Sequence, residues 1–409
     1  MSPLVLQYTI CVRPDATNFR KLVLLLKARL NDIRAFLRRA DTLLFVLCLC
    51  ASVMGIIIIS SATKSYNSAT YVTVQTASLL IGIVLYFLFT IIDVDIIVGQ
   101  WPLLVVVEIV LLLLLIPFGV SGGTGNKSWL RFLGIGIQPS EVVKVIYIVL
   151  SAKHISYLRE YRSLSSPVSI LQLGAHFGVL FVLLLVISGD LGNALIFFFI
   201  FIMTLFAAGV KLYWFLFGAA GLALVIPLAW NTVLSDRQKM RILAPYDATV
   251  DPDGYGVNWE PNQAKIALSS GRFTGTGLYQ GTQTQSDAIN SKHADYIFAA
   301  IGEEMGMLGC IIVIVLLSLI IIRCVYVGIH SRSSFGMLLC FGVAAMLFFQ
   351  TFENIGMCIG LTPVIGVTLP FYSYGGSSLF TTFAAMGLVS GIYYRPRPSR
   401  YTGYSLSTQ

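Results

Sequence analysis

Apolar residues fill most of the chain in runs that are long enough to cross a lipid bilayer. Ten such runs follow one another, each close to the roughly 20 residues that a transmembrane helix needs. They cover residues 42–61, 70–92, 96–118, 137–156, 168–188, 191–209, 212–230, 296–322, 335–358 and 376–394. The pattern predicts an all-α polytopic membrane protein with about ten transmembrane helices.

One long polar segment, residues 231–295, separates the seventh run from the eighth. It holds 13 of the chain's 46 Asp, Glu, Lys and Arg residues, and it contains the amide-rich stretch GTQTQ (281–285). Long loops in compact proteins are usually lids or binding elements. We therefore expect this loop to carry chemistry, and its last residues, HADYIFAAIGEE (293–304), to bring carboxylates into the eighth helix.

The two ends of the chain predict its orientation. Residues 18–39 alternate apolar and basic positions at a helical period, which predicts an amphipathic helix on the membrane surface within an N-terminal segment, 1–41. If that segment is cytoplasmic, the short segments on its side carry 17 Lys and Arg against 3 on the other. Both termini, including the tail 395–409, are then cytoplasmic, and the loop 231–295, which is part of the ten-helix domain 42–394, is extracytoplasmic.

The composition excludes several function classes. Only 11% of the residues are charged and 56% are hydrophobic, which excludes an ordinary soluble domain. The net charge of +8 does not indicate a nucleic-acid partner, because eight Lys and Arg lie in residues 13–39, beside the first predicted span. None of the seven Cys lies in the long loop and the chain has only four His, so we expect neither a loop disulfide nor a structural metal site.

Polar clusters at membrane depth supply the candidate site. Glu141 and Lys144 are three residues apart and can pair on one helical face. Such residues within spans are functional candidates, although an ion pair that clamps two helices explains them equally well. Trp129 is either a site residue or an interfacial anchor, and Asp190 in SGDLGNA is explained by helix capping.

The long loop and the segment LTPVIGVTLPFYSYGGSS (361–378) supply the others. Asp295, taken alone, is explained as a cap of the eighth helix, and DPDG (251–254) as a turn rather than a calcium loop. Arg241 and Lys265 are each followed by an apolar run that would hold them at the membrane surface. The prolines and glycines of 361–378 predict a break in the helix, which either lines a cavity or packs as a re-entrant turn.

Four motifs together resemble the SEDS family of RodA, FtsW and SpoVE. They are QPSE (138–141), DLG (190–192), HADYIFAAIGEE (293–304) and LPFYSYGGSS (369–378), in that family's order and over nearly the whole chain from about residue 42. GTQTQ and NIGMCIGLTPV (354–364) are most similar to RodA. The sequence departs from the family pattern at Gly189, Ala294 and Arg237, where a proline, a threonine and an aromatic residue are usual.

The resemblance implies a peptidoglycan glycosyltransferase that polymerises lipid II on the outer face of the cytoplasmic membrane during cell elongation, together with a class B penicillin-binding protein. Asp295 matches the family's essential loop aspartate, which makes it the predicted catalytic residue. The predicted substrate-binding residues are Trp129, Glu141, Lys144, Arg241, Lys265, Glu303, Ser373 and Tyr374.

The expected reaction inverts the anomeric carbon, so that one carboxylate suffices as base and cations stabilise the leaving pyrophosphate. Asp295 would deprotonate the acceptor 4-hydroxyl, and Arg241 and Lys265 lead the candidates for the pyrophosphate. No cofactor is certain, and a divalent cation, Mg²⁺ or Mn²⁺, stays open. Two other functions also stay open, a lipid II flippase and a non-catalytic scaffold for cell-wall synthesis.

Overall fold

The computed structural model of the chain describes residues 40–395 apart from residues 67, 121–126, 133–134, 233 and 248. The predicted amphipathic helix at 18–39 and the tail beyond residue 395 lie outside the described residues. The side chain of Arg237, one of the residues at which the sequence departs from the family pattern, also lies outside the described part of the structure.

Seven helices among the described residues are long and apolar enough to cross a bilayer. They are α2 (Thr42–Ala62), α3 (Ser68–Ile91), α5 with α6 (Trp101–Phe118), α8 with the π-helical turn η1 (Pro167–Ser188), α10 (Leu212–Thr232), α14 (Ile297–Ile329) and α15 (Ser334–Ile359). Within these ranges, α5 covers Trp101–Leu113, α6 Leu115–Phe118, α8 Pro167–Leu183 and η1 Leu184–Ser188, and the short α4 (Val94–Gly99) precedes α5. The predicted polytopic, all-helical membrane class is confirmed.

Three further helices occupy the remaining predicted runs. They are α7 (Pro139–Tyr161), α9 (Leu191–Ala207) and α16 (Gly376–Tyr394). The 17 residues of α9 make it shorter than the other apolar helices, and α7 carries the buried charges Glu141 and Lys144. A total of ten spans therefore stays a prediction, although a helix is found at each of the ten predicted positions.

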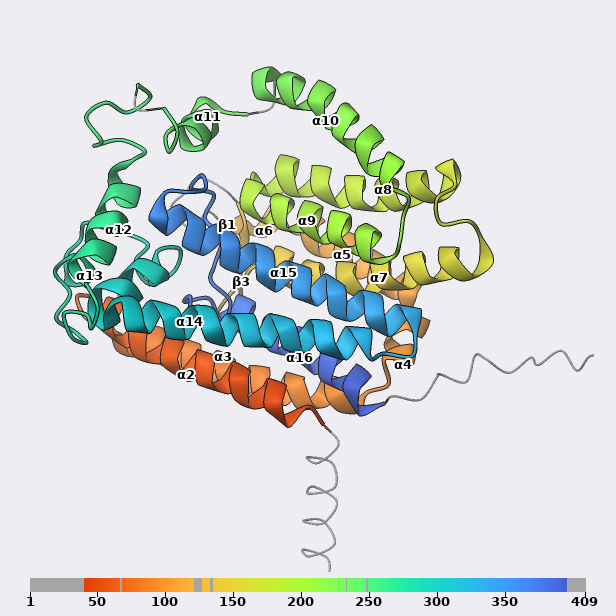
Figure 1. Cartoon of the computed structure of the whole chain (residues 1–409), viewed down its shortest axis with the longest axis horizontal. Helices are drawn as coiled ribbons and strands as arrows, with labels where there is room; N and C mark the ends of the chain where they lie inside the picture. Colours follow the sequence, from red (N-terminus) through yellow and green to blue (C-terminus); the bar gives the residue numbers. More distant parts are fainter. Residues whose placement is uncertain are drawn as a thin grey trace, which may run out of the picture.

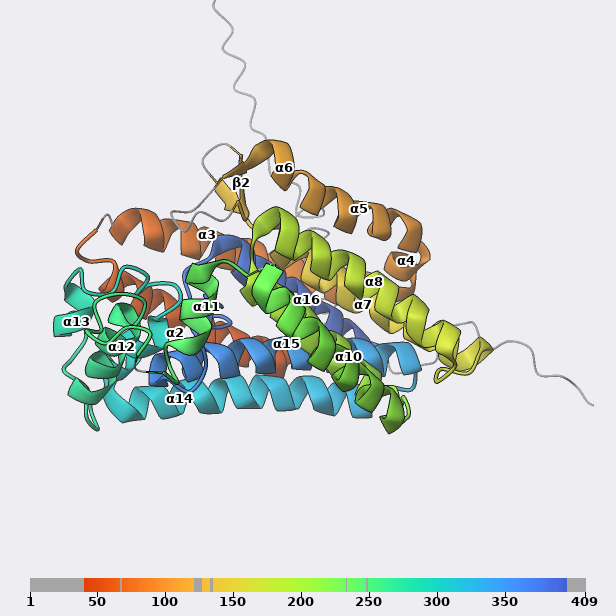
Figure 2. The same cartoon turned by 90° about the horizontal axis from the view of Figure 1, so that it is seen from above.

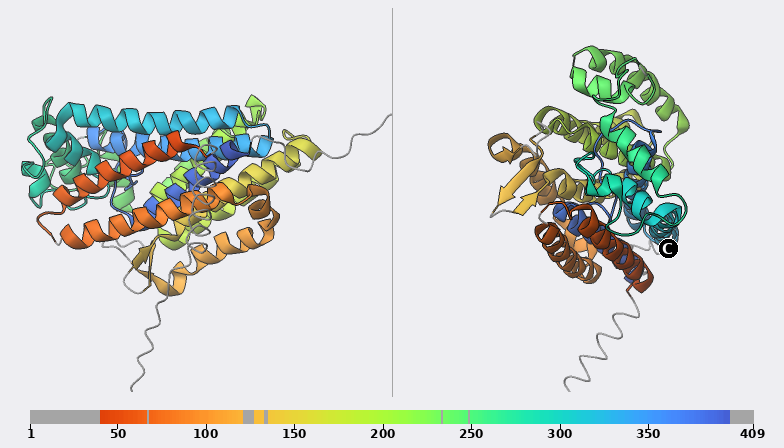
Figure 3. Two further views of the ribbon diagram at one scale, coloured as in Figure 1. Left: turned by 90° about the horizontal axis from the view of Figure 1, so that it is seen from below. Right: turned by 90° about the vertical axis from the view of Figure 1, so that its left-hand side faces the viewer.

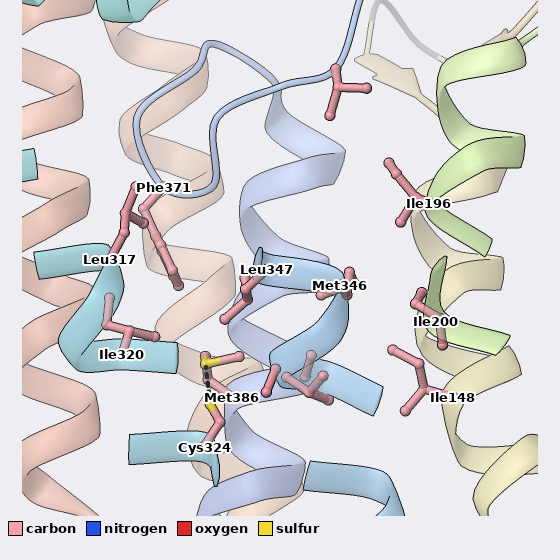
Figure 4. Close-up of a cluster of buried hydrophobic side chains, with 14 of the residues drawn as sticks. Ile148, Ile196, Ile200, Leu317, Ile320, Cys324, Met346, Leu347, Phe371 and Met386 are labelled. Atoms are coloured by element: carbon pink, nitrogen blue, oxygen red, sulfur yellow. Dashed lines mark hydrogen bonds between the residues drawn. The ribbon is translucent and has the colours of Figure 1, made fainter. Parts of the chain in front are cut away.

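The helices lie side by side around an apolar core (Figure 1). α16 packs along α3, and α15 lies between α14 and α9. Figure 4 shows the middle of this core, where Leu317 and Ile320 of α14 face Met346 and Leu347 of α15, and Ile200 of α9 approaches from the other side. These side chains are at most 2% exposed, so burial of apolar surface among helices holds the bundle together.

α10 stands apart from this bundle. It has no buried residue along its 21 positions, and it lies at the edge of the molecule in Figure 1 and in the right panel of Figure 3. Its first turn is tethered by Trp214, whose Nε1 donates to the carbonyl oxygen of Ser165 at 2.9 Å. The apolar sides of this helix are therefore open to the hydrocarbon of a membrane.

A small antiparallel sheet was not expected from the sequence. The strands β1 (Gly119–Val120), β2 (Trp129–Phe132) and β3 (Ile135–Ile137) pair in the order β1-β2-β3 beside α6 (Figure 2). They fill the gap between the third and fourth apolar runs, where the backbone leaves the helices but must still pair its N–H and C=O groups. The hydrogen bonds between the three strands pair these backbone groups.

The long loop folds into helices at one end of the bundle. α11 (Asp236–Leu243), α12 (Trp259–Ser270) and α13 (Thr282–Gln285) gather there (Figures 1 and 2). α14 is interrupted at Gly306, which has φ 66°. The amides of Met307 and Leu308 bond instead to the carbonyl oxygens of Arg272 and Phe273, at 2.9 and 3.2 Å. The part of the loop around Arg272 and Phe273 is thus bonded to the backbone at a break in α14.

Candidate active site

Asp295 lies immediately before α14, but it does not cap that helix. The cap position is Tyr296, and no side chain caps the helix there. The capping explanation of Asp295 is therefore wrong. No described residue is hydrogen-bonded to its carboxylate, which lies against Gly366 at a distance of 3.3 Å between Oδ2 and the position of a Cβ on that glycine. Gly366 has φ +72°, which favours glycine, and because it has no Cβ it leaves space beside the carboxylate of Asp295.

The backbone that carries this aspartate is fixed by a run of hydrogen bonds. Three consecutive carbonyl oxygens, at residues 293, 294 and 295, each accept one bond. The donors are, in that order, the amide of Tyr374 (2.8 Å), the hydroxyl of Ser373 (2.6 Å) and Nδ2 of Asn354 (2.7 Å). The segment before α14 is therefore held rigidly between α15 and the 361–378 segment.

Two buried amides complete this frame. Asn354 also donates to the carbonyl oxygen of Val367, at 2.7 Å. Gln75 of α3 donates to the carbonyl oxygen of Ser373 (3.1 Å) and accepts from the amide of Gly375 (3.2 Å). The sequence alone did not assign a role to Asn354 or Gln75. Each is an amide side chain inside an otherwise apolar run, and that feature would have marked both as candidates.

Ser373 and Tyr374 help to position the aspartate through their bonds to residues 293 and 294, and their contact with substrate stays a prediction. The Ser373 hydroxyl donates to Ala294 and accepts from the amide of Leu369 at 2.8 Å, and the residue is 5% exposed. The Tyr374 ring packs on Tyr71, with ring centroids 4.8 Å apart. The Ser373 hydroxyl is therefore fully engaged within the protein, while the Tyr374 ring is partly buried.

Glu303 also has a structural role in place of the predicted substrate contact. The residue is fully buried, and one carboxylate oxygen accepts from the amide of Gln283 at 2.8 Å. The other oxygen accepts from the amide and the hydroxyl of Thr284, each at 2.7 Å. The carboxylate has no capacity left for substrate, because the GTQTQ turn encloses it.

Glu141, Lys144 and Asp190 form a polar group beside Asp295. Lys144 Nζ lies 2.7 Å from Glu141 Oε1, and the two side chains are 1% and 5% exposed, which confirms the predicted pairing. Asp190 caps α9 as predicted, accepting from the amide of Asn193 at 3.0 Å. It also accepts from Nε2 of Gln138 at 3.1 Å and so joins the start of α9 to the start of α7.

Two neighbouring pockets open between these groups. One is lined by Gln138, Glu141, Asn193, Ile196, Gln350, Gly366, Val367 and Thr368. The other is lined by Gly189, Asp190, Leu191, Gln238, Arg241, Ile242, Val364 and Ile365. The bond between Gln138 and Asp190 links their walls, and Gly366, which borders Asp295, follows Ile365 in the chain. Arg241 thus lies close enough to Asp295 to act on it electrostatically, and its contact with substrate stays a prediction.

Burial and neighbouring carboxylates tune the aspartate. Burial, together with the negative charges of Glu260 and Asp190, raises the pKa of Asp295 to about 6, while Arg241 acts in the opposite direction. Burial, with Lys292 next to it, lowers the pKa of His293 to about 4. Near neutral pH the carboxylate of Asp295 is therefore a better proton acceptor than the imidazole of His293.

Lys265 and Trp129, two further predicted substrate-binding residues, also line neither pocket. Lys265 is exposed on α12, and its side chain lies against Gly360 at the C-terminal end of α15, where a cation is favoured by the helix dipole. The Trp129 ring covers Gly136 across the sheet, with Cε3 3.3 Å from the position of a Cβ on that glycine. Their contact with substrate stays a prediction.

Comparisons with known proteins agree on one family. The sequence model of the FtsW, RodA and SpoVE family, described as cell cycle protein, matches residues 41–397. The peptidoglycan glycosyltransferase MrdB of Escherichia coli K12 is 33% identical over 299 residues, which are 72% of this chain and 78% of that protein. A probable peptidoglycan glycosyltransferase FtsW of Wigglesworthia glossinidia brevipalpis is 32% identical over 89% of this chain and 96% of its own.

Solved structures share the fold. A chain from work on the structural coordination of polymerization and crosslinking by a peptidoglycan synthase complex superposes with a TM-score of 0.72. It is 26% identical, and the match covers 87% of this chain and 97% of that one. The rod shape determining protein RodA of Thermus thermophilus, 24% identical, gives 0.62 over 87% and 96%.

Removing one partner of the Glu141–Lys144 pair should destabilise the protein. Lys144→Met leaves the Glu141 carboxylate buried and unpaired, at a cost of roughly 3–5 kcal/mol in the free energy of unfolding. The double variant Glu141→Gln/Lys144→Met should regain most of that loss. Thermal unfolding of both variants in the same detergent measures the effect, and equal stability of Lys144→Met and wild type would contradict it.

Proposed function

The chain belongs to the family of FtsW, RodA and SpoVE, and from this premise we propose that it polymerises lipid II into glycan strands with Asp295 as the catalytic base. The protein is a multi-pass membrane protein and a peptidoglycan glycosyltransferase, the activity for which relatives at 32–34% identity over most of the chain are named. Its substrate and the residues that act on it are the proposal.

The observation that carries the proposal is the state of Asp295. Its carboxylate has no described hydrogen-bond partner, yet the backbone on which it stands is fixed by three hydrogen bonds. Its pKa of about 6 is close to the pH at which an enzyme operates, which suits a general base. A rigid, unpartnered carboxylate of this kind is available to accept a proton from substrate.

In the proposed step the acceptor sugar's 4-hydroxyl oxygen attacks the anomeric carbon of the donor. The bond from that carbon to the pyrophosphate oxygen breaks, and the hydroxyl proton passes to Asp295. Negative charge then grows on the departing lipid pyrophosphate. Arg241, in the pocket that also contains Gln238, is the described cation best situated to stabilise that charge, since it acts on Asp295 electrostatically.

The membrane setting suits a substrate with a lipid tail. Apolar helices surround the bundle, and α10, which precedes α11 and Arg241, exposes apolar surface on every side. We place the enzyme in the cytoplasmic membrane with both termini in the cytoplasm and the loop 231–295 outside, because Lys and Arg predominate on the opposite side. No nucleic-acid partner follows from its charge.

We propose a class B penicillin-binding protein as partner and cell elongation as the process served. The similar chain from a peptidoglycan synthase complex comes from work on coordinated polymerization and crosslinking, which supports pairing with a crosslinking enzyme. Similarity to MrdB and to RodA supports a role in cell shape.

The other two functions fit the geometry less well. A flippase needs a hydrophilic route across the bilayer, whereas the middle of the bundle is filled by apolar side chains (Figure 4). A scaffold needs no unpartnered carboxylate with a raised pKa. Polymerisation of lipid II by the purified protein, with and without the partner, separates these functions.

Asp295→Asn should abolish polymerisation while the protein stays folded. Asparagine keeps the size of the side chain but does not accept the proton, so we expect the rate to fall at least about 1,000-fold, within the range of about 10²–10⁴ that is typical of one acid–base group, with little change in thermal stability. Polymerisation by purified Asp295→Asn at a rate near that of wild type would refute the general-base role.

The pH dependence of polymerisation should report the same carboxylate. Asp295 must be ionised to accept a proton, so the rate should fall about tenfold per pH unit below about 6. Glu260→Gln removes a negative charge that raises this pKa, so the fall should move to lower pH. Arg241→Gln removes a positive charge and should move it to higher pH. Unchanged profiles in both variants would assign the ionisation to another group.

Arg241 and Lys265 should now behave differently. Arg241→Ala should lower the turnover rate about 100-fold, the scale expected for loss of one charge-stabilising donor, with a smaller loss of lipid II binding. Lys265→Ala is the matched control, because its side chain lies outside both pockets, and we expect a change of less than about threefold. Weaker lipid II binding with unchanged turnover in Arg241→Ala would limit Arg241 to binding.

A further inference from the structure

Four rings gather beside residues 293–295, at the end of the bundle that carries the long loop. Tyr66 lies in the turn between α2 and α3, Tyr71 in the first turn of α3 and Tyr374 in the 361–378 segment, all around His293. The centroid of the His293 ring is 5.0 Å from that of Tyr71, 5.6 Å from that of Tyr374 and 6.3 Å from that of Tyr66. We call these four residues the aromatic cluster.

The rings of the cluster are held in place but are not buried. Tyr66 is 38% exposed, and the other three members are partly exposed. Lys292 fixes the position of Tyr66, because its Nζ lies 4.8 Å from the centroid of that ring and donates to a loop carbonyl oxygen at 2.6 Å. Gln75, one turn after Tyr71 in α3, bonds to the backbone on both sides of Tyr374. Aromatic surface that is already ordered binds a ligand at little cost in side-chain entropy.

His293 has a ring nitrogen that the protein leaves without a partner. Its Nδ1 is buried and accepts from or donates to no described residue. Burial and the charge of Lys292 lower the pKa of the imidazole to about 4, so the ring is neutral near pH 7 and has one N–H donor and one acceptor nitrogen. A neutral group that both donates and accepts matches a hydroxyl, which does the same.

Aromatic faces beside a neutral hydrogen-bonding group suit a carbohydrate. A sugar ring has a face of C–H bonds, which packs on the negative face of an aromatic ring, and hydroxyls around its edge. A phosphate group would need an open cation, but Lys292, the cation in contact with the cluster, is fully buried and donates to protein oxygens. The cluster therefore fits the sugar part of a substrate and not its pyrophosphate.

The cluster is close to Asp295 and shares no residue with the pocket of Arg241. Asp295 follows His293 by two residues, which is at most about 7 Å of chain. The pocket of Arg241 is bordered by α11, the start of α9 and residues 364–365, none of which carries a ring of the cluster. A sugar on the cluster can therefore present a hydroxyl to Asp295 while a pyrophosphate is bound elsewhere.

We propose that the aromatic cluster binds the acceptor sugar, whose 4-hydroxyl attacks the donor. Tyr66 and Tyr71 pack against the C–H face of the sugar, and His293 bonds to one of its hydroxyls. This inference rests on the proposed function, because it divides that site into an acceptor side at the cluster and a donor side at Arg241. His293 is the most informative member, since its Nδ1 has no other bonded role among the described residues.

The test measures binding of a soluble disaccharide of N-acetylglucosamine and N-acetylmuramic acid to the full-length protein in lipid nanodiscs, by saturation-transfer NMR. Wild type should bind it, and His293→Phe should weaken the affinity about fivefold, the scale of one hydrogen bond. Tyr71→Leu should weaken it by a similar factor, since it removes one aromatic face. Tyr255→Leu is the matched control, because Tyr255 is an exposed loop tyrosine stacked on Trp259 outside the cluster, and its affinity should equal that of wild type.

Thermal unfolding of the same variants separates ligand binding from packing. His293→Phe keeps a ring and removes an unpaired nitrogen, so its stability should equal or exceed that of wild type, while its disaccharide affinity and its polymerisation rate should both fall. Absence of disaccharide binding by wild type, or wild-type affinity in both His293→Phe and Tyr71→Leu, would overturn the proposal and leave the cluster with a packing role only.

Two further variants separate this proposal from the assignments of the base and the donor side. Asp295→Asn should still bind the disaccharide, so failure of the general-base assignment is distinguishable from failure of this one. Arg241→Ala should also bind it as wild type does, but should lose affinity for a polyprenyl pyrophosphate, which His293→Phe should keep. Loss of polyprenyl pyrophosphate binding in His293→Phe would overturn the acceptor assignment.

Discussion

Hydrogen bonding of irregular backbone within a membrane protein is the constraint on which the rest of this structure depends. Two stretches leave the helices beside the site, residues 293–295 and the 361–378 segment. Neither can leave N–H or C=O groups unpaired in an apolar setting. They solve this together, since Tyr374, Ser373 and Asn354 supply one donor to each of three consecutive carbonyls. The position of Asp295 is a consequence of that pairing.

The same constraint explains the polar loop. Two carboxylates, Glu303 and Glu304, lie one after the other in an apolar helix and would be costly to bury alone. The GTQTQ turn encloses the first with amides and hydroxyls, while Ser61 and Gln285 each donate to the second, at 2.7 and 3.0 Å. Loop residues 272–277 also bond to the backbone around the break at Gly306. The loop is therefore packed into α14, and it reaches the site through α11 and through its last residue, Asp295.

The candidate catalytic group is a side chain that this network of hydrogen bonds leaves without a partner. Among the described residues the carboxylate of Asp295 has no hydrogen-bond partner, and several buried polar atoms near it, including His293 Nδ1 and Tyr296 Oη, also have none. An unpartnered carboxylate fits a group that accepts a proton. A framework that satisfies its own backbone can hold a few unsatisfied side-chain atoms in fixed positions, which is what a preorganised site requires.

The sequence by itself determined the membrane class and the positions of the apolar helices, and it supplied the candidate residues of the site. Runs of about twenty apolar residues dictate helices because no other local structure satisfies its backbone in hydrocarbon, and i,i+3 spacing alone predicted the Glu141–Lys144 pair. Motif order then marked Asp295, whose local context suggested nothing more than a cap.

Only the tertiary structure decided which polar residues serve the backbone and which face the pockets. Ser373, Tyr374 and Glu303 stand in the same motifs as Asp295, yet the Ser373 hydroxyl and the Glu303 carboxylate are hydrogen-bonded within the protein, and the Tyr374 ring packs on Tyr71 of α3. Asn354, Gln75 and Gln350 are the reverse case, single amides in apolar runs whose roles depend on contacts between helices. Hydrogen-bond partners that lie far apart in the chain leave no local sequence pattern. The sequence therefore names the candidate residues, but it does not show which of them bond to the backbone and which face the pockets.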